Sequence, residues 1–429
     1  MELFATKNFG KPEALTIAGY KALGGFQGLD KALAMPQQAV IDEVKKASLR
    51  GRGGAGFPAG VKWGFLPKDN PKPRYLAVNA DEGEPGTFKD RLLMEGDPFG
   101  FLEGTVISSY ALNVHHAYVY VRGEFFKARR IVQDAVDALY KEGLLGKSVC
   151  GSGYELDVTV HPGAGAYICG EETALLESLE GKRGEPRIKP PFPAVVGAFG
   201  CPTIINNVET LAYVPWILAK GADWFAGYGI AGEGGPKLFC MSGDVKRPGL
   251  YELHSGANLR ELIYEHCGGI VGDKKLLAVI PGGASSAPLT VDEIDVGMDF
   301  ETLKKKGTML GSAATMVIAE GRCVVKILAR TLKFFHHESC GQCTPCREGT
   351  GWLHRLMERL EHGGEPDVIR KDMGLLFGIC DNMVGNTICV LADAAVMPTK
   401  GFVNKFRGVF EAHMDGRGCP LHRDAQGHP

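Results

Sequence analysis

Three cysteines, Cys340, Cys343 and Cys346, form a C-x2-C-x2-C run. This spacing puts three thiolates on one tight loop, which matches three corners of a 4Fe-4S cubane. Structural zinc sites usually take their cysteines as separated pairs, so the triplet favours an iron-sulfur cluster over zinc. Inert buried thiols are the alternative, but they have no need of this spacing.

The fourth iron of such a cluster needs a remote ligand. Spacing alone leaves three candidates, Cys380, Cys389 and Cys419. Cys419 is followed by Pro420, as in some ferredoxin ligand runs, and this makes it the rival candidate on the residues alone.

A glycine-rich stretch, residues 51–60, contains the pattern G-x-G-x-x-G. The dinucleotide fingerprint of this form follows a strand and opens a helix, whereas the apolar spacing of residues 39–49 predicts a helix before it. The stretch is therefore either an ordinary glycine-rich turn or a loop whose bare amides approach a phosphate. In the second case Arg52 and Lys62 supply the positive charge.

Two further loops carry clustered carboxylates. Residues 79–84 place one amide and three carboxylates directly after a strand-type run. Residues 163–173 combine glycines with Glu171 and Glu172 at the start of a predicted helix. Such carboxylates either bind ribose or ribityl hydroxyls, or only face solvent in a turn and balance a helix dipole.

Other segments are suited to covering a ligand. Phe57, Trp63 and Phe65 either stack on a ring system or fill core. The Pro-rich stretch 187–193 cannot be regular helix or central strand, and we expect it to lie over a cleft as a lid or clamp.

The elements that position these residues follow from apolar periodicity. Strand-type runs at 75–79, 117–121 and 156–160 alternate with helical patterns at 125–140 and 172–179. This alternation predicts an α/β layer whose ligands bind at the carboxyl ends of the strands.

The pattern changes after residue 236. Four short strand-type runs and one helical run, 257–269, predict a small α+β domain extending to Gly321. The four runs are 237–243, 249–254, 276–282 and 314–320. From Arg322 onward helical patterns surround the cysteines, with the longest helix expected around 352–362.

The composition of the 429 residues is that of a globular enzyme, with 45% hydrophobic and 23% charged residues and a net charge of −2. This balance predicts no general attraction to nucleic acid or anionic lipid. The chain lacks an apolar run of about 20 residues and the pattern of a secretory signal. We therefore expect a reducing compartment, with the 12 cysteines mainly thiols or metal ligands.

Six motifs, spread in order over nearly the whole chain, resemble those of the NADH-binding flavoprotein (51-kDa) subunits of respiratory complex I. They are GRGGAGFPAGVKW, NADEGEPGTFKDR, GAGAYICGEETALLES, KPPFP, INNVETL and ESCGQCTPCREG. The resemblance to this family implies an N-terminal segment with the glycine-rich loop (1–59), a Rossmann-like FMN domain (60–230), a ubiquitin-like β-grasp domain (231–321) and a helical bundle with a 4Fe-4S cluster (322–429).

The resemblance also implies a set of cofactor-binding residues. Those around FMN are Gly51, Arg52, Gly53, Lys62, Asn79, Asp81, Glu82, Tyr167, Gly170, Glu171, Asn206 and Asn207. Those contacting NADH are Phe57, Phe65, Glu84, Glu172, Lys189 and Phe192, with Phe65 and Phe192 flanking the adenine. The fourth cluster ligand carries over to Cys389. The segment that begins with this cysteine, CVLADAA, departs at two positions from the family's usual CALGDAA.

The implied function is an NADH dehydrogenase subunit that passes hydride from NADH to FMN and electrons singly to the 4Fe-4S cluster, feeding the respiratory chain to quinone. The cofactors supply this chemistry. The implied partners are a thioredoxin-like 2Fe-2S subunit of the 24-kDa type and the large iron-sulfur subunit. The implied location is peripheral, on the cytoplasmic side of the inner membrane, or in the matrix of a mitochondrion.

Two rival functions share part of the pattern. One is the diaphorase subunit of an NAD-linked hydrogenase or formate dehydrogenase, which carries the same motifs. The other is an electron-relay subunit with a cluster but no nucleotide chemistry, and the glycine and acidic loops argue against it.

Overall fold

The computed structural model describes residues 2–67 and 69–421. They form two compact units. The first comprises the chain up to Gly83 with Thr87–Cys240 and Leu250–Ala257, and the second comprises Glu84–Gly86, Met241–Gly249 and the chain from Asn258 onward.

A four-stranded parallel sheet is the centre of the first unit. Its order is β3-β2-β1-β4, with β1 (Tyr75–Ala80), β2 (His116–Val121), β3 (Asp157–Pro162) and β4 (Thr203–Asn207). The strands predicted at 75–79, 117–121 and 156–160 are confirmed. The fourth strand, β4, was not predicted from the pattern, because its run TIINN is short and half polar.

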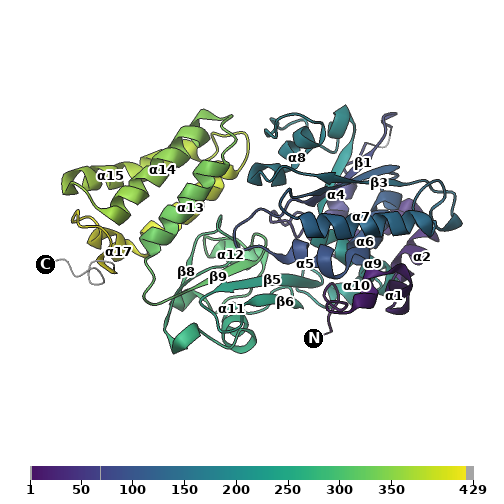
Figure 1. Ribbon diagram of the computed structural model, residues 1–429, viewed down its shortest axis with the longest axis horizontal. Coiled ribbons are helices and arrows are strands. Elements are labelled where there is room, and N and C mark those ends of the chain that lie inside the picture. Colours follow the sequence, from purple (N-terminus) through teal and green to yellow (C-terminus); the bar gives the residue numbers. More distant parts are fainter. Residues whose placement is uncertain (1, 68, 422–429) are drawn as a thin grey trace. The chain divides into compact units, whose positions relative to one another are not determined.

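Helices α6 (Pro98–Ala111) and α7 (Phe126–Lys141) lie along this sheet (Figure 1). The predicted helices at 39–49, 125–140 and 172–179 correspond to α3, α7 and α8. The other helices of the unit are η1 (Pro12–Leu15), α1 (Ile17–Ala22), α2 (Gln27–Leu33), α3 (Gln37–Lys46), α4 (Ala59–Trp63), α5 (Lys89–Gly96), η2 (Val149–Gly151), η3 (Tyr167–Gly170), α8 (Glu172–Leu179), η4 (Ala198–Gly200), α9 (Val208–Lys220) and α10 (Ala222–Ala226).

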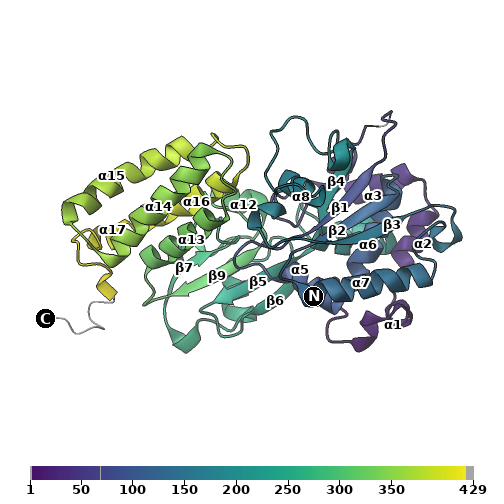
Figure 2. The ribbon, with the colours of Figure 1, turned by 45° about the horizontal axis from the view of Figure 1, so that its top comes forward.

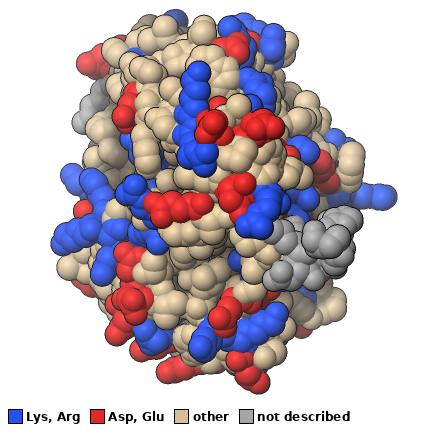
Figure 3. Space-filling view, turned by 90° about the vertical axis from the view of Figure 1, so that its left-hand side faces the viewer, with Lys and Arg blue, Asp and Glu red and all other residues tan. Residues whose placement is uncertain are grey.

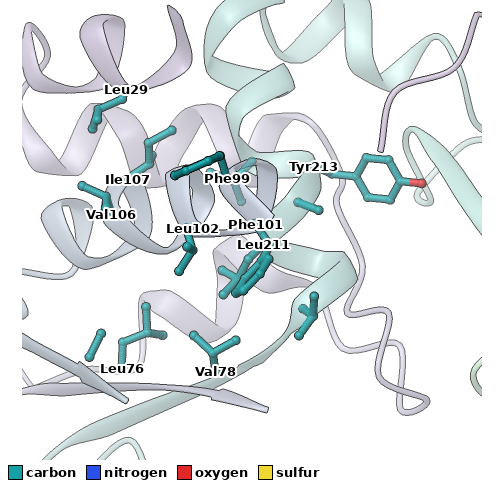
Figure 4. Close-up of a cluster of buried hydrophobic side chains, with 14 of the residues drawn as sticks. Leu29, Leu76, Val78, Phe99, Phe101, Leu102, Val106, Ile107, Leu211 and Tyr213 are labelled. Carbon is teal, nitrogen blue, oxygen red and sulfur yellow. The ribbon is translucent and has the colours of Figure 1, made fainter. Parts of the chain in front are cut away.

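The core of the first unit is built around α6, which is apolar on nearly all sides and therefore fully enclosed. Figure 4 shows that the side chains of α6 pack against β1, which lies below them in this view, and against α2 and α9. Phe99, Phe101 and Ile107 of α6 are buried, as are Leu76 of β1 and Leu211 of α9. This packing fixes the sheet whose carboxyl edge carries the polar loops.

A five-stranded sheet has the order β6-β5-β9-β7-β8. Its strands are β5 (Pro236–Gly243), β6 (Gly249–His254), β7 (Leu276–Ile280), β8 (Leu289–Thr290) and β9 (Ala314–Ala319), so the four strands predicted here are confirmed. The short helical elements are α11 (Leu259–Glu261), η5 (Leu262–His266), η6 (Val271–Asp273), η7 (Val291–Glu293) and α12 (Phe300–Lys305). The predicted helix at 257–269 becomes a π-helical turn at η5, where the Cys267 N–H reaches the Leu262 carbonyl at 3.0 Å.

The helices predicted after Arg322 are confirmed. They are α13 (Val324–Glu338), α14 (Thr344–His362), α15 (Pro366–Met383), α16 (Leu391–Lys405) and α17 (Arg407–Ala412). Helices α13 to α16 pack side by side (Figure 2). The short connection between α13 and α14 carries the first two cysteines of the triplet, and Cys346 lies in the first turn of α14.

Among the described helices, none combines the length and the apolar character needed to cross a bilayer. Figure 3 shows one face of the molecule, on which basic and acidic side chains are interspersed rather than gathered by sign.

Candidate cofactor sites

The glycine-rich loop lies between α3 and α4 and is closed by its own hydrogen bonds. The Gly51 N–H donates to the Phe57 carbonyl at 2.8 Å, and Arg50 Nε donates to the Gly56 carbonyl at 2.7 Å. A Cβ on Gly53 would lie only 3.1 Å from the Cβ of Asn207, the last residue of β4. The loop therefore reaches the carboxyl edge of the parallel sheet, although no strand leads into it.

Arg52 turns its side chain into the protein. The residue is 0% exposed, and its guanidinium donates to the carbonyls of Gly234 and Pro236 at 2.9 and 3.0 Å. Glu233 lies 3.5 Å away, and the ring of Tyr213 is beneath the charge. Its side chain therefore anchors the loop, and its backbone N–H donates to the Thr210 hydroxyl at 2.8 Å.

The loop after β1 meets the 163–173 stretch. Asn79 Nδ2 donates to the Gly170 carbonyl at 2.9 Å, and Asn79 Oδ1 accepts the Asp81 N–H at 3.1 Å. A Cβ on Gly170 would approach the Asp81 carbonyl to 3.3 Å. Two of the motifs are thus brought together by the sheet, as their positions after strands predict.

The carboxylate of Glu82 binds the backbone at the start of the neighbouring helix α5. Its buried carboxylate accepts the backbone N–H groups of Asp90 and Arg91 at 2.8 and 3.0 Å, in the first turn of α5. Burial raises the pKa of Glu82, and the adjacent Asp90 adds to the rise. Glu82 therefore shapes the loop by holding the start of α5.

Four charged side chains from three motifs form a cluster. Glu171 caps α8 by accepting the N–H groups of Thr173 and Ala174. Lys189 Nζ lies 2.9 Å from Glu171 Oε1 and 3.1 Å from Glu172 Oε1. Lys62 approaches the same cluster from α4.

Lys62 Nζ lies 3.8 Å from Glu172 Oε2 and donates to the Ile205 carbonyl of β4 at 2.7 Å. Burial lowers the pKa of Lys62, and Glu172 opposes that effect. The ammonium is thus held at the edge of the sheet beside the glycine loop, where the sequence places a charge partner for phosphate.

The aromatic residues divide into core and surface. Trp63 is buried, and its indole N–H donates to Asn206 Oδ1 at 2.9 Å, so it fills core. Phe57 and Phe65 are about half exposed, with ring centroids 5.8 Å apart. Phe192 of the Pro-rich stretch is 58% exposed. Exposed aromatic faces of this kind are suited to stacking on a base or flavin ring.

Asn207 joins the sheet to a buried charge network that the sequence did not reveal. Its Oδ1 caps α9 by accepting the Glu209 N–H at 3.0 Å, and its Nδ2 donates to Asp90 Oδ2 at 2.7 Å. Lys89 Nζ lies 2.8 Å from both Asp90 and Glu209. The burial of Lys89 could not be predicted from the sequence, because the polar motif NADEGEPGTFKDR is typical of an exposed loop. Only the packing of the helices and the sheet places this lysine in the interior.

The sequence motifs also did not indicate Arg122 as a residue near the site. A Cβ on Gly83 would lie 2.3 Å from Arg122 Nη1 and 3.1 Å from the ring of Tyr167, so glycine permits a close approach at the end of β2. Glu84 belongs to the second unit, where its Oε1 accepts the N–H and hydroxyl of Ser285 at 2.8 and 2.7 Å.

The cysteine triplet lies at the connection between α13 and α14 in the second unit. The Ile388 N–H donates to Cys343 Sγ at 3.2 Å, which brings the residue before Cys389 against the triplet. The Ser339 hydroxyl lies 3.3 Å from Cys346 Sγ. Hydrogen bonds to sulfur of this kind tune iron-sulfur clusters, so the donor set fits a 4Fe-4S group.

The two other candidate ligands lie elsewhere. Cys380 is buried in α15, and burial raises the pKa of its thiol to about 12. The Cys419 thiol lies within 4.8 Å of the ligand atoms of Cys323, Glu361 and His413. These contacts favour Cys389 over Cys380 and Cys419 as the candidate for the fourth cluster ligand.

Comparison with known proteins bears on these sites. Residues 44–216 match the family described as Nuo51 FMN-binding domain, residues 237–310 match the SLBB domain, and residues 326–413 match the NADH-ubiquinone oxidoreductase-F iron-sulfur binding region. The F 2 subunit of the NADH-quinone oxidoreductase of Rhizobium meliloti (strain 1021) is 50% identical over 418 residues, which cover 97% of this chain and 98% of the relative. The chain belongs to this family of NADH-quinone oxidoreductase subunits.

The F subunit of the NADH-quinone oxidoreductase of Mycobacterium tuberculosis (strain H37Rv) is 48% identical over 423 residues, covering 97% of this chain and 94% of the relative. Among solved structures, an NAD+-reducing [NiFe]-hydrogenase chain in the air-oxidised state is similar with a TM-score of 0.79 at 35% identity. That match covers 88% of this chain and 63% of the hydrogenase chain. The same type of hydrogenase in its H2-reduced state gives a TM-score of 0.81 at 34% identity, covering 93% of this chain and 68% of that one.

Family membership confirms the fold class expected from the sequence. The parallel sheet belongs to the FMN-binding region, the SLBB match covers the strands β5 to β8 of the second sheet, and the iron-sulfur region coincides with the helical bundle. FMN and a 4Fe-4S cluster are thus the cofactors of this chain, and NADH is its substrate.

Proposed function

We propose that this chain is the subunit of an NADH:quinone oxidoreductase that oxidises NADH at FMN and delivers electrons to a 4Fe-4S cluster. The observation that carries this proposal is the meeting of the glycine loop, Asn79, Gly170 and Lys62 at the carboxyl edge of one parallel sheet. When bound there, FMN would supply the acceptor for hydride from NADH and the means of passing electrons singly to the cluster.

The chain's own residues bind and orient in this proposal. The glycine amides and Lys62 receive the flavin phosphate. Asn79 and Asp81 offer oxygen and nitrogen atoms to ribityl hydroxyls. Phe65 and Phe192 offer exposed faces to the adenine of NADH. The rest of the site keeps the assignment given by the resemblance, and no side chain is assigned as an acid or base for the hydride step.

Cys340, Cys343, Cys346 and Cys389 are the proposed cluster ligands. The hydrogen bond from Ile388 to Cys343 supports this choice, because it brings the segment of Cys389 to the triplet. The proposed partners are the 24-kDa type 2Fe-2S subunit and the large iron-sulfur subunit. Through them the chain would be peripheral to the cytoplasmic face of the inner membrane.

A visible spectrum of the purified chain tests this function. Flavin bands that NADH bleaches support the dehydrogenase, whereas cluster absorption without flavin would indicate an electron relay. The similarity to the hydrogenase chain keeps a diaphorase subunit as the second candidate. Co-purifying proteins separate the two, because a diaphorase brings down a hydrogenase or formate dehydrogenase subunit.

We also propose the four-part division at residues 59, 230 and 321. Two of these boundaries have support. The parallel sheet ends at Asn207 and the second sheet begins at Pro236, on either side of residue 230, and α13 begins at Val324, just after residue 321. Limited proteolysis should cut first near residues 230 and 321, where the chain is exposed, and not at residue 59, which is buried at the start of α4.

Replacing Lys62 with alanine should weaken FMN binding. A hydrogen bond to a charged group contributes about 1.5–3 kcal/mol, so we expect a roughly tenfold to hundredfold higher Kd for FMN. Fluorescence titration of the apoprotein measures this. Lys46→Ala, at an exposed ion pair with Asp223, is the control. Full FMN occupancy and unchanged turnover in Lys62→Ala would contradict the assignment.

The chain should strongly prefer NADH to NADPH. The 2′-phosphate of NADPH adds about −1.5 to −2 charges, whereas the NADH residues implied by the resemblance include Glu84 and Glu172. Lys189 is already paired with Glu171 and Glu172, so it offers little free charge. Because like charges held together cost several kcal/mol, we expect kcat/KM for NADPH to be roughly hundredfold lower.

Steady-state kinetics with both nucleotides measures this preference. Glu172→Gln should lower the ratio of kcat/KM for NADH to kcat/KM for NADPH, because it removes one negative charge. Comparable kcat/KM values for the two nucleotides in the wild-type chain would contradict the electrostatic argument.

A further inference from the structure

Four metal-ligating side chains meet in the second unit, away from the cysteine triplet. They are Cys323, Glu361, His413 and Cys419, and all four are buried. Their ligand atoms, one from each residue, all lie within 4.8 Å of one another. Neither the proposed flavin site nor the proposed cluster uses any of them.

The four residues come from four separate segments of the helical part. Cys323 caps the start of α13, Glu361 lies in the last turn of α14, His413 follows α17, and Cys419 lies in the segment beyond it. Cys419 is tied to α14 by its N–H, which donates to the Glu361 carbonyl at 2.9 Å. Folding therefore assembles a group that no local sequence spacing indicates.

The distances among the ligand atoms of Cys323, Glu361 and His413 match three edges of a tetrahedral centre, and the Cys419 thiol lies within 4.8 Å of each of them. Cys323 Sγ lies 3.4 Å from both Glu361 Oε2 and His413 Nε2, and His413 Nε2 lies 3.7 Å from Glu361 Oε2. Zinc binds sulfur at about 2.3 Å and nitrogen or oxygen at about 2.0–2.2 Å, so the edges of its tetrahedron are roughly 3.4–3.8 Å.

The surroundings orient two of these ligands. His413 Nδ1 lies 2.7 Å from the Val409 carbonyl, so Nδ1 carries the proton. The lone pair of Nε2 then faces Cys323 and Glu361. The Lys326 N–H, in the first turn of α13, donates to Cys323 Sγ at 3.5 Å and so helps to orient this sulfur.

The group is separate from the 4Fe-4S ligands. Cys323 precedes α13 and the triplet follows it, and α13 is 15 residues long, or about 22 Å at 1.5 Å per residue. Along α14 the order is reversed, with Cys346 in the first turn and Glu361 in the last. The two groups therefore lie at opposite ends of the α13 and α14 hairpin.

We propose that Cys323, Glu361, His413 and Cys419 bind one zinc ion in a closed, structural site. Two thiolates, an imidazole and a carboxylate suit zinc, whereas calcium and magnesium require oxygen ligands. Two cysteines do not provide the usual four-cysteine ligation of an iron-sulfur cluster. Binding releases the two thiol protons, and the ion then joins the ends of α13 and α14 to the segment after α17.

Metal analysis of the complete purified chain tests the proposal. We expect about one zinc per chain in addition to the cluster iron. Cys323→Ser combined with Cys419→Ser should lower zinc at least tenfold and leave iron and FMN unchanged. Cys380→Ser, which alters another buried cysteine of the helical part, should keep both metals.

X-ray absorption at the zinc edge of the wild-type chain provides a second measurement that does not depend on the variants folding. It should show two sulfur ligands and two nitrogen or oxygen ligands. Four sulfur ligands would place zinc at the cysteine triplet and overturn the proposal. Absence of zinc after growth with zinc, zinc retained in the double variant, or a Cys323–Cys419 disulfide found by mass spectrometry would also overturn it.

Discussion

Cys389→Ser is expected to abolish the 4Fe-4S cluster while NADH still bleaches the flavin. A neutral hydroxyl is a poor substitute for a thiolate at iron. Hydride transfer precedes the cluster, so it should not depend on Cys389. Electron delivery beyond the cluster should fail.

Three measurements on the variant check this expectation: iron content, the low-temperature paramagnetic signal and stopped-flow flavin reduction. Cys380→Ser is the matched control, because Cys380 is a buried cysteine of the same helical part and belongs to neither proposed metal site, and this variant should keep the cluster. Cys419→Ser tests the rival fourth ligand and should also keep the cluster iron. A cluster retained in Cys389→Ser and lost in Cys419→Ser would instead assign the fourth ligand to the Cys-Pro pair.

The second large effect is on stability. Lys89→Met should destabilise the first unit by about 3–5 kcal/mol, because removing one partner of a buried ion pair leaves an uncompensated charge. Lys89 Nζ lies 2.8 Å from the carboxylates of Asp90 and Glu209, and all three residues are buried. Burial favours the neutral acid of Glu209, yet nearby cations, Lys89 first among them, hold its pKa below the usual value.

Urea unfolding followed by tryptophan fluorescence measures this loss. Trp63, Trp216 and Trp224 lie in the first unit, so three of the chain's 4 tryptophans report on it. Lys46→Met is the matched control. Its partner Asp223 is exposed, and exposed ion pairs contribute little to stability, so its urea midpoint should not change. Equal midpoints for Lys89→Met and the wild-type chain would show that the buried charges are compensated in another way.

The Lys89 network also explains why the acidic motif keeps its shape. Lys89 and Asp90 follow the loop that carries Asp81 and Glu82, and Asp90 accepts a hydrogen bond from Asn207 at the end of β4. Glu209 accepts the Leu238 N–H at 3.0 Å, which ties α9 to β5. A charge group in the interior thus holds together the loops at the carboxyl edge of the sheet.

The sequence by itself determined much of the local structure and the type of chemistry. The strands at β1, β2 and β3 and the helices α7, α8 and α14 follow from apolar periodicity, because the period of burial is a property of each segment alone. The C-x2-C-x2-C triplet indicated an iron-sulfur cluster for a similar reason, since three ligands on one loop are a local arrangement. The order of six motifs indicated the family.

Tertiary structure decided what depends on contacts between distant segments. It separated Trp63, which is core, from the exposed Phe57 and Phe65, and it turned Arg52 inward towards residues near 234. It placed the segment of Cys389 at the triplet and Cys419 elsewhere. Residue spacing carries no information on such pairings, because the direction of a side chain and its distant neighbours are set only when helices and sheets pack.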